Sequence, residues 1–125
     1  MSFILLTVEH VIAIHDEVLE LHELQGMAGD KSLEGALSRV GNRLKYGLIE
    51  DIYSLAASYA TAISQAHCFN DGNKRTAFQV MDIILDLNGI NAIWDVEGVG
   101  QKIVLLSQSR LDESDLAQWL RRVAV

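Results

Sequence analysis

The chain contains no proline, and its 125 residues include a single cysteine. One cysteine excludes an internal disulfide and suits a reducing compartment, so we expect a cytoplasmic protein. Basic residues are scarce, because ten Lys and Arg stand against 17 Asp and Glu and give a net charge of −7. This balance argues against direct binding to nucleic acid or to an anionic membrane. No apolar run is long enough to span a bilayer.

What the chain has in quantity is apolar residues, which make up 50% of the sequence. That share is too high for a disordered protein. The length fits one domain covering residues 1–125, with no internal repeat and no linker-like composition inside it.

The apolar spacing predicts an all-α, compact bundle of about six helices. The expected helices cover residues 8–22, 33–44, 52–66, 73–88 and 96–107, and a last one follows Asp112. Thr7, Ser32, Asp95 and Asp112 are the expected N-caps. In the last helix the pattern places four residues inward: Leu116, Trp119, Leu120 and Val123. A short two-stranded piece that pairs residues 91–94 with residues 3–6 is a further expectation.

Residues 67–75 form a polar island between two of the most apolar segments of the chain. They read His-Cys-Phe-Asn-Asp-Gly-Asn-Lys-Arg, and the predicted helices on both sides are apolar on most of their faces. Such helices belong in a core. Polar groups held between them are costly unless something uses them, so the loop is the candidate functional site.

Lys74 and Arg75 stand where the fourth helix begins. The N-terminus of a helix is its positive end, so each cation there is unfavourable by roughly 0.3–1 kcal/mol. A bound anion removes this conflict, because the free N–H groups of Gly72, Asn73 and Lys74 and two cationic side chains would converge on it. Phosphate is the natural ligand, and the absence of a Cβ at Gly72 lets it approach closely.

Asp71 and His67 complete the predicted chemistry of the loop. Asp71 is its only carboxylate, so it is the expected ligand of a Mg²⁺ ion that phosphate oxygens and water would also coordinate. His67, without a nucleophile beside it, suggests a general base that acts on an incoming hydroxyl.

Each residue also has a plainer explanation when taken alone. Asp71 could cap the fourth helix, His67 could be a surface histidine, and Arg75 could pair with a surface carboxylate. Cys68 is expected to be a packed thiol rather than a nucleophile. The spacing of the other three histidines gives no shared face for a metal, so they are expected to be structural or exposed: His10, His15 and His22. It is the joint occurrence of the loop residues, in this order, that favours function.

The loop resembles the signature of the Fic/Doc superfamily, His-x-Phe-x-Asp/Glu-Gly-Asn-Gly-Arg-x-x-Arg. The matching positions are His67, Phe69, Asp71, Gly72, Asn73 and Arg75. Lys74 replaces a glycine and Phe78 replaces the second arginine, and both departures are typical of the Doc (death-on-curing) branch. The pairs His15-Asp16, Glu34-Gly35 and Asn88-Gly89 also look like that branch.

The resemblance implies a small helical bundle and a transferase that uses ATP and Mg²⁺. Most members transfer AMP to a protein hydroxyl, whereas Doc proteins are toxins that transfer the γ-phosphate to a threonine of elongation factor Tu. In that scheme His67 is the base, Asp71 holds Mg²⁺, and Lys74 and Arg75 bind phosphates. Gly72 and Asn73 shape the anion hole, and Phe69 anchors the loop.

The resemblance also implies two protein partners. One is the target, which would pair with the main chain of residues 44–50. The other is a small antitoxin whose tail folds on binding. AMP transfer and a catalytically silent binding module remain the two alternatives to a toxin kinase.

Overall fold

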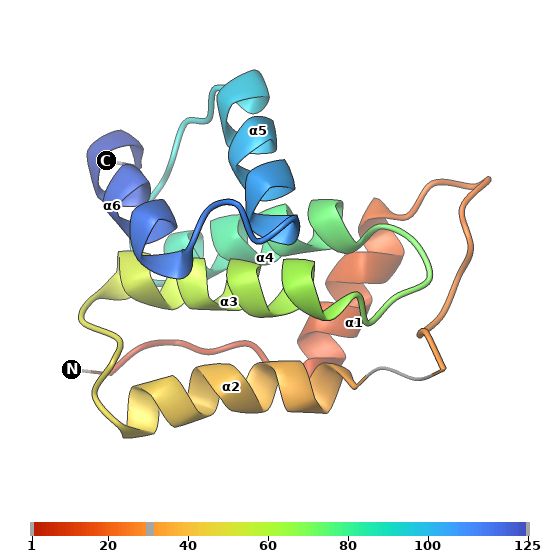
Figure 1. Cartoon of the computed structure of the whole chain (residues 1–125), viewed down its shortest axis with the longest axis horizontal. Helices are drawn as coiled ribbons and strands as arrows, with labels where there is room; N and C mark the ends of the chain where they lie inside the picture. Colours follow the sequence, from red (N-terminus) through yellow and green to blue (C-terminus); the bar gives the residue numbers. More distant parts are fainter. Residues whose placement is uncertain (1, 30–31, 125) are drawn as a thin grey trace.

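The computed structural model describes residues 2–29 and 32–124, and these fold into six α-helices, as predicted (Figure 1). The helices are α1 (Val8–Val18), α2 (Leu33–Lys45), α3 (Ile52–Ala66), α4 (Asn73–Leu87), α5 (Val96–Ser107) and α6 (Glu113–Val123). None of the helices in these ranges has the length and apolar character needed to cross a membrane.

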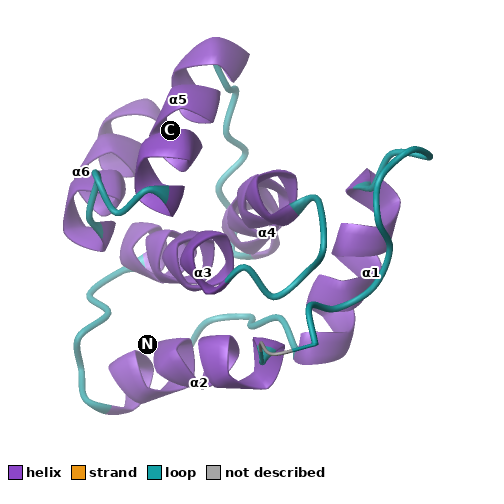
Figure 2. Cartoon of the chain, turned by 45° about the vertical axis from the view of Figure 1, so that its right-hand side comes forward, coloured by secondary structure: helices purple, strands orange, loops and turns teal. Residues whose placement is uncertain are grey.

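The antiparallel pair α3 and α4 lies at the centre of the molecule. Figure 2 shows the two helices nearly end-on, with the other four around them. α2 and α6 pack on α3, α1 packs on α4, and α5 contacts both central helices. The helix α3 is therefore covered on almost every side, and its residues 55–64 are all buried.

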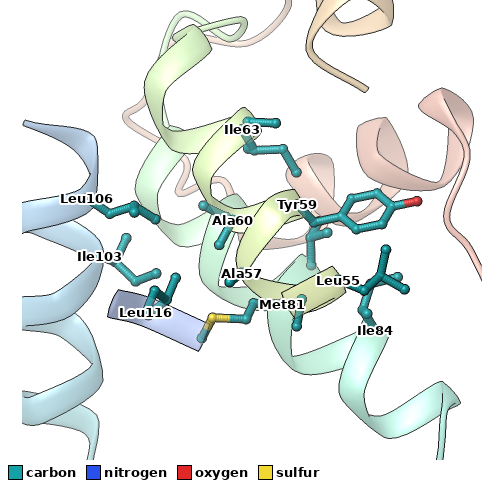
Figure 3. Packing of buried hydrophobic residues seen from close by; sticks show 14 of the residues in the cluster. Leu55, Ala57, Tyr59, Ala60, Ile63, Met81, Ile84, Ile103, Leu106 and Leu116 are labelled. Atoms are coloured by element: carbon teal, nitrogen blue, oxygen red, sulfur yellow. The ribbon is translucent and has the colours of Figure 1, made fainter. Parts of the chain in front are cut away.

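The core fills the space around α3 with large aliphatic side chains from its neighbours (Figure 3). Alanines of α3, such as Ala57 and Ala60, leave room for Met81 of α4 and Leu116 of α6, all of them at most 5% exposed. Burying one such large side chain stabilises the fold by about 1.5–3 kcal/mol. The helices that carry the polar loop are thus held by the core itself.

Three of the four expected N-caps are confirmed by side-chain hydrogen bonds. Thr7 accepts from the N–H of His10, Ser32 from that of Gly35, and Asp112 from that of Asp115. Asp95 occupies the N-cap position of α5 without a side-chain cap bond.

The helix predicted for residues 8–22 ends four residues early, at Val18. The carbonyl of Val18 accepts a hydrogen bond from Nη1 of Arg75 at 3.1 Å. The carboxylate of Glu23 turns back and accepts from the N–H of Glu20 at 2.8 Å. One tertiary contact and one local turn thus stand where the apolar pattern alone would extend the helix.

The predicted pairing of residues 91–94 with residues 3–6 is wrong, because neither segment of the described chain forms a strand. The side chain of Asn88 bonds to both backbone groups of Ile4. Its Oδ1 accepts from the N–H of Ile4 at 2.8 Å, and its Nδ2 donates to the carbonyl of Ile4 at 3.0 Å. The hydroxyl of Tyr59 does the same for Leu6, at 3.1 and 3.0 Å. These side chains satisfy the backbone groups that a strand partner would need.

The inward face of α6 is only partly as predicted. Leu116 and Leu120 are fully buried and Trp119 is half-buried, but Val123 is 38% exposed. Ala117 lies in the core instead.

Asp51→Ala tests the N-terminus of α3. Asp51 accepts from the N–H of Ser54 at 2.8 Å and pairs with Arg121, whose Nε lies 2.7 Å away. We expect the free energy of unfolding to fall by about 1–2 kcal/mol in chemical denaturation, because a cap and a partly exposed ion pair are lost together. Asp95→Ala, at a cap position without a cap bond, should cost less than about 0.5 kcal/mol.

The effect of Asp51 should depend on pH. Burial raises the pKa of Asp51, but the hydrogen bonds from Arg121 and Ser54 outweigh burial, and its net pKa is lowered. A carboxyl with a lowered pKa stabilises the fold above its ordinary pKa and loses this effect as the pH falls. The difference between wild type and Asp51→Ala should therefore shrink below about pH 4. A difference that is constant from neutral to acidic pH would contradict this assignment.

Candidate functional site

The polar loop connects α3 to α4, and its first residue, His67, is the C-cap of α3. Its backbone is left-handed, with φ 50° and ψ 45°. Glycine is the usual residue in this conformation, and a residue with a Cβ is strained there by roughly 1–2 kcal/mol. The imidazole is exposed, and no other residue of the described chain hydrogen-bonds to it. An accessible ring of this kind can take a proton from a bound hydroxyl.

Phe69, the expected anchor of the loop, is buried, and the side chain of Asn73 bonds to its backbone. The Phe69 side chain is 3% exposed. The Asn73 amide accepts from the N–H of Phe69 at 3.0 Å and donates to its carbonyl at 2.9 Å. Asn73 thus shapes the loop with its side chain and leaves its own N–H to the helix terminus.

His15 of α1 contacts two residues of the loop, Phe69 and Asp71. The sequence alone did not predict these contacts. Its ring is 1% exposed and stacks on Phe69 with centroids 3.7 Å apart and an interplanar angle of 6°. Its Nε2 lies 2.7 Å from the carbonyl oxygen of Asp71. The expectation that His15 is structural is confirmed. The signal of its role in the sequence is the His15-Asp16 pair, which resembles the Doc branch.

The segment after α1 pins the loop from the other side through an antiparallel bridge between Met27 and Phe69. The N–H of Ala28 donates to the carbonyl of Cys68 at 2.8 Å, and the N–H of Asn70 donates to that of Gly26 at 3.1 Å. Cys68 is fully buried, as expected of a packed thiol. The loop is therefore held by α1, by α4 and by this bridge.

The N-terminus of α4 is open toward the loop. Gly72 is the N-cap residue in a left-handed conformation, with φ 80°, and no side chain caps the helix. Within the described chain, no acceptor meets the N–H groups of Gly72, Asn73 or Lys74. The helix terminus keeps the donors that an anion requires.

The two cations of the site differ in their surroundings. Lys74 is exposed and has no ion-pair partner among the described residues. Arg75 instead contacts the segment after α1: Nη2 pairs with Oε2 of Glu23, and Nη1 lies 3.4 Å from Oε1 of Glu20. The hydrogen bond from Arg75 lowers the pKa of Glu23, and the hydrogen bond to Glu23 raises the pKa of Arg75. The plainer explanation, an ion pair, thus describes Arg75 in this conformation.

Asp71 can take part in a metal site only with outside ligands. Its Oδ2 accepts from the N–H of Leu24 at 2.8 Å, and no described residue donates to its other oxygen. Nowhere in residues 2–29 and 32–124 do three metal-ligating side chains gather. A Mg²⁺ ion at Asp71 would therefore need water and phosphate oxygens, which is the usual composition of a nucleotide-bound Mg²⁺ site.

Phe78 stands one turn beyond Arg75 and lines an apolar hollow of about 270 Å³ between α4 and α5. Its ring packs edge-on against Trp94, with centroids 5.7 Å apart. Val99 and Ile103 form the opposite wall. Phe78 holds the position of the second arginine in the family signature, so this part of the site is apolar rather than positively charged.

Residues 44–50 lie at the wrong end of α3 to hold a target beside His67. They precede the first residue of this helix, whereas His67 follows its last (Figure 1). A helix of 15 residues is about 22 Å long, so a main chain paired there could not present its hydroxyl to the imidazole. The prediction of this docking segment is therefore wrong.

Asn73→Ala tests the support of the loop. We expect the amide of Phe69 to exchange with solvent at least about tenfold faster in hydrogen-exchange NMR, because its acceptor is lost. Asn70→Ala is the matched control, since among the described residues the side chain of Asn70 bonds only to the carbonyl of Gln25. Equal exchange at Phe69 in both variants would show that Asn73 does not fix the loop.

Comparison with known proteins agrees with this geometry. Residues 5–85 match the Fic/DOC family. The chain is also similar to the protein kinase doc of Escherichia phage P1, with 32% identity over 116 residues that cover 92% of this chain and 91% of that protein. The chain belongs to the Fic/DOC family.

Proposed function

We propose that this protein is a Doc-type protein kinase, which transfers the γ-phosphate of ATP to a Ser or Thr hydroxyl of a translation protein, with elongation factor Tu as the expected target. The observation that supports this most is an exposed imidazole, His67, held on a fixed loop next to an uncapped helix N-terminus. The similarity to a protein named as a kinase points the same way.

In the proposed reaction His67 takes the proton of the target hydroxyl. The hydroxyl oxygen then forms a bond to the γ-phosphorus, and the bond from that phosphorus to the β-phosphate oxygen breaks, so that ADP leaves. The N–H groups at the start of α4, with Lys74 and Arg75, hold the oxygens on which negative charge develops. These donors are preorganised because Asn73 and Phe69 fix the loop.

Mg²⁺ is the proposed cofactor, and Asp71 is the residue that would hold it. When bound, the ion neutralises charge on the phosphate oxygens. The carboxylate of Asp71 would be the protein ligand of the ion. The backbone of Asp71 is held in place by the hydrogen bond between its carbonyl and His15.

AMP transfer is the less favoured alternative because of Phe78. The side chain packs against Trp94 in an apolar wall and brings no cation to the phosphates. Residues of this wall suit a hydrocarbon or a ring surface better than an anion.

We place the target main chain along residues 26–28 instead of residues 44–50. The hydrogen bonds of the bridge come from the residues on either side of Met27 and Phe69, which therefore form a non-hydrogen-bonded antiparallel pair. The N–H and C=O of Met27 therefore point away from Phe69 and are available to an extended peptide. This edge adjoins the loop that carries His67.

A toxin of this type would be paired with a small antitoxin whose tail folds on binding. Such a tail needs an apolar surface. Val96 and Val104, which are 79% and 40% exposed on α5, provide one beside the hollow.

Intact mass spectrometry of elongation factor Tu, incubated with this protein, ATP and Mg²⁺, tests the proposal. We expect a gain of one phosphate, and none with His67→Ala, because removing the base should slow transfer by about 10²–10⁴-fold. A gain of one AMP would replace kinase by AMP transferase at the same site. An unchanged gain with His67→Ala would remove the base role.

No mass change on elongation factor Tu, together with no binding of ATP, would favour the binding module without catalysis. In that case the biological effect of the protein should survive His67→Ala. The control is His10→Ala, which removes an exposed histidine of α1 whose ring bonds to the backbone of Thr7, away from the loop.

A further inference from the structure

The hydrogen bond between His15 and Asp71 sets the direction of a backbone donor, the N–H of Gly72. Nε2 of His15 lies 2.7 Å from the carbonyl oxygen of Asp71. A carbonyl oxygen can only accept, so Nε2 is the donor of this bond. The peptide bond that follows Asp71 is trans, and in a trans peptide the C=O and the N–H point in opposite directions. The N–H of Gly72 therefore points away from the ring of His15, and no acceptor of the described chain meets it.

The conformation of Gly72 would allow this peptide to turn over. Its φ of 80° and ψ of 15° are close to those of the third residue in a type II turn. The third residue of a type I turn has φ about −90° and ψ about 0°, and the two turns differ by a flip of the preceding peptide. Glycine adopts both signs of φ readily. A flip would turn the carbonyl of Asp71, in place of the N–H of Gly72, toward a bound anion.

The helix α4 holds the next peptide but not this one. The carbonyl of Gly72 accepts from the N–H of Thr76 at 2.9 Å and from its hydroxyl at 2.8 Å. The N–H of Asn73, in the same peptide, is therefore directed by the helix itself. The carbonyl of Asp71 receives no bond from α4, and among the described residues only His15 donates to it.

The ring of His15 is itself held in a fixed direction. It is 1% exposed and stacks on Phe69 with centroids 3.7 Å apart and an interplanar angle of 6°. Gly72 lies directly against its edge, because a Cβ at Gly72 would stand 3.5 Å from Nε2. A ring packed on two sides keeps its Nε2 aimed at Asp71.

We propose that His15 is a positioning residue of the phosphate site, whose Nε2–H holds the carbonyl of Asp71 and thereby directs the N–H of Gly72 at the bound phosphate. The proposal rests on the proposed function in one respect, that the start of α4 binds phosphate oxygens. The buried ring does not reach the phosphate and acts only through the peptide between Asp71 and Gly72. The phosphate site is therefore complete only with α1 packed against the loop.

Binding of inorganic tripolyphosphate, measured by titration calorimetry at low salt, tests the proposal without requiring phosphate transfer. His15→Leu keeps a large side chain at this position and removes the donor. We expect it to bind tripolyphosphate roughly ten- to a hundredfold more weakly than wild type, because the N–H of Gly72 no longer donates to a charged acceptor. Far-UV circular dichroism should show that its helix content is unchanged.

His15→Gln is the matched variant, because its amide offers an N–H donor roughly as far from the backbone as Nε2 of histidine. We expect its affinity for tripolyphosphate to lie within about threefold of wild type. Both variants are uncharged and both lose the stacking on Phe69, so the difference between them reports the donor alone. Equal affinities for His15→Leu and His15→Gln would overturn the positioning role, since a merely structural residue would not be rescued by a donor.

A second measurement uses wild-type protein, in case neither variant folds. In the ¹H–¹⁵N spectrum the amide proton of Gly72 should move downfield when tripolyphosphate is added, because it becomes a donor to an anion. A long-range ¹H–¹⁵N spectrum of the imidazole should show a hydrogen on Nε2 of His15. A Gly72 signal that stays in place while tripolyphosphate is bound, or a bare Nε2, would also overturn the role.

These outcomes are separable from those of the kinase proposal. Weak binding by His15→Leu and restored binding by His15→Gln, without phosphate transfer to elongation factor Tu, would support the positioning role and reject the target. Transfer by wild type with equal tripolyphosphate affinities in the two variants would support the kinase and reject the positioning role. No binding of tripolyphosphate by wild type would overturn the phosphate site and this role together.

Discussion

The loop from His67 to Gly72 joins α3, which is buried on nearly every side, to α4, which packs along it, and this constraint governs the rest of the site. Neither α3 nor α4 can shift without disturbing the core, because residues 55–64 of α3 are all buried and α4 packs along them. The ends of the loop are therefore fixed in space. A His in a left-handed C-cap and a Gly in a left-handed N-cap then turn the chain within six residues.

Between those fixed ends, the loop is held by polar contacts that come from three directions. Asn73 clamps the backbone of Phe69, His15 stacks on its ring and bonds to Asp71, and Met27 bridges it from the opposite side. Each hydrogen bond contributes about 1 kcal/mol, so together they can hold a strained backbone of the kind seen at His67. The result is a well-supported loop whose free groups are the exposed imidazole of His67 and the first N–H groups of α4.

The sequence predicts the helical frame well and the contacts between distant segments poorly. Apolar spacing and N-caps find six helices, and the limits of α3 are those expected, because these signals are local. The early end of α1 is decided by Arg75, which lies 57 residues away from Val18, and no local pattern carries that information. The same holds for the failed strand pairing, which side chains of Asn88 and Tyr59 replace.

The candidate site shows the same division. The motif residues are close together in sequence, so their clustering could be predicted, and the burial of Phe69 fits the anchor role that the resemblance implies. The partners of Arg75 could not be predicted, because Glu20 and Glu23 are far from it in sequence and the predicted helix of residues 8–22 left no turn at Glu20. The expected conflict between two cations and a helix N-terminus is real, and for Arg75 the fold relieves it with its own carboxylates.

Transfer of label from ATP is the measurement that tests the central claim most directly. Parallel incubations of a bacterial lysate with this protein and with ATP labelled in either the γ- or the α-phosphate report which phosphorus reaches a protein target. The account predicts γ-label on one predominant protein, and none with His67→Ala. Label from the α-phosphate, or γ-label that persists without His67, would contradict it.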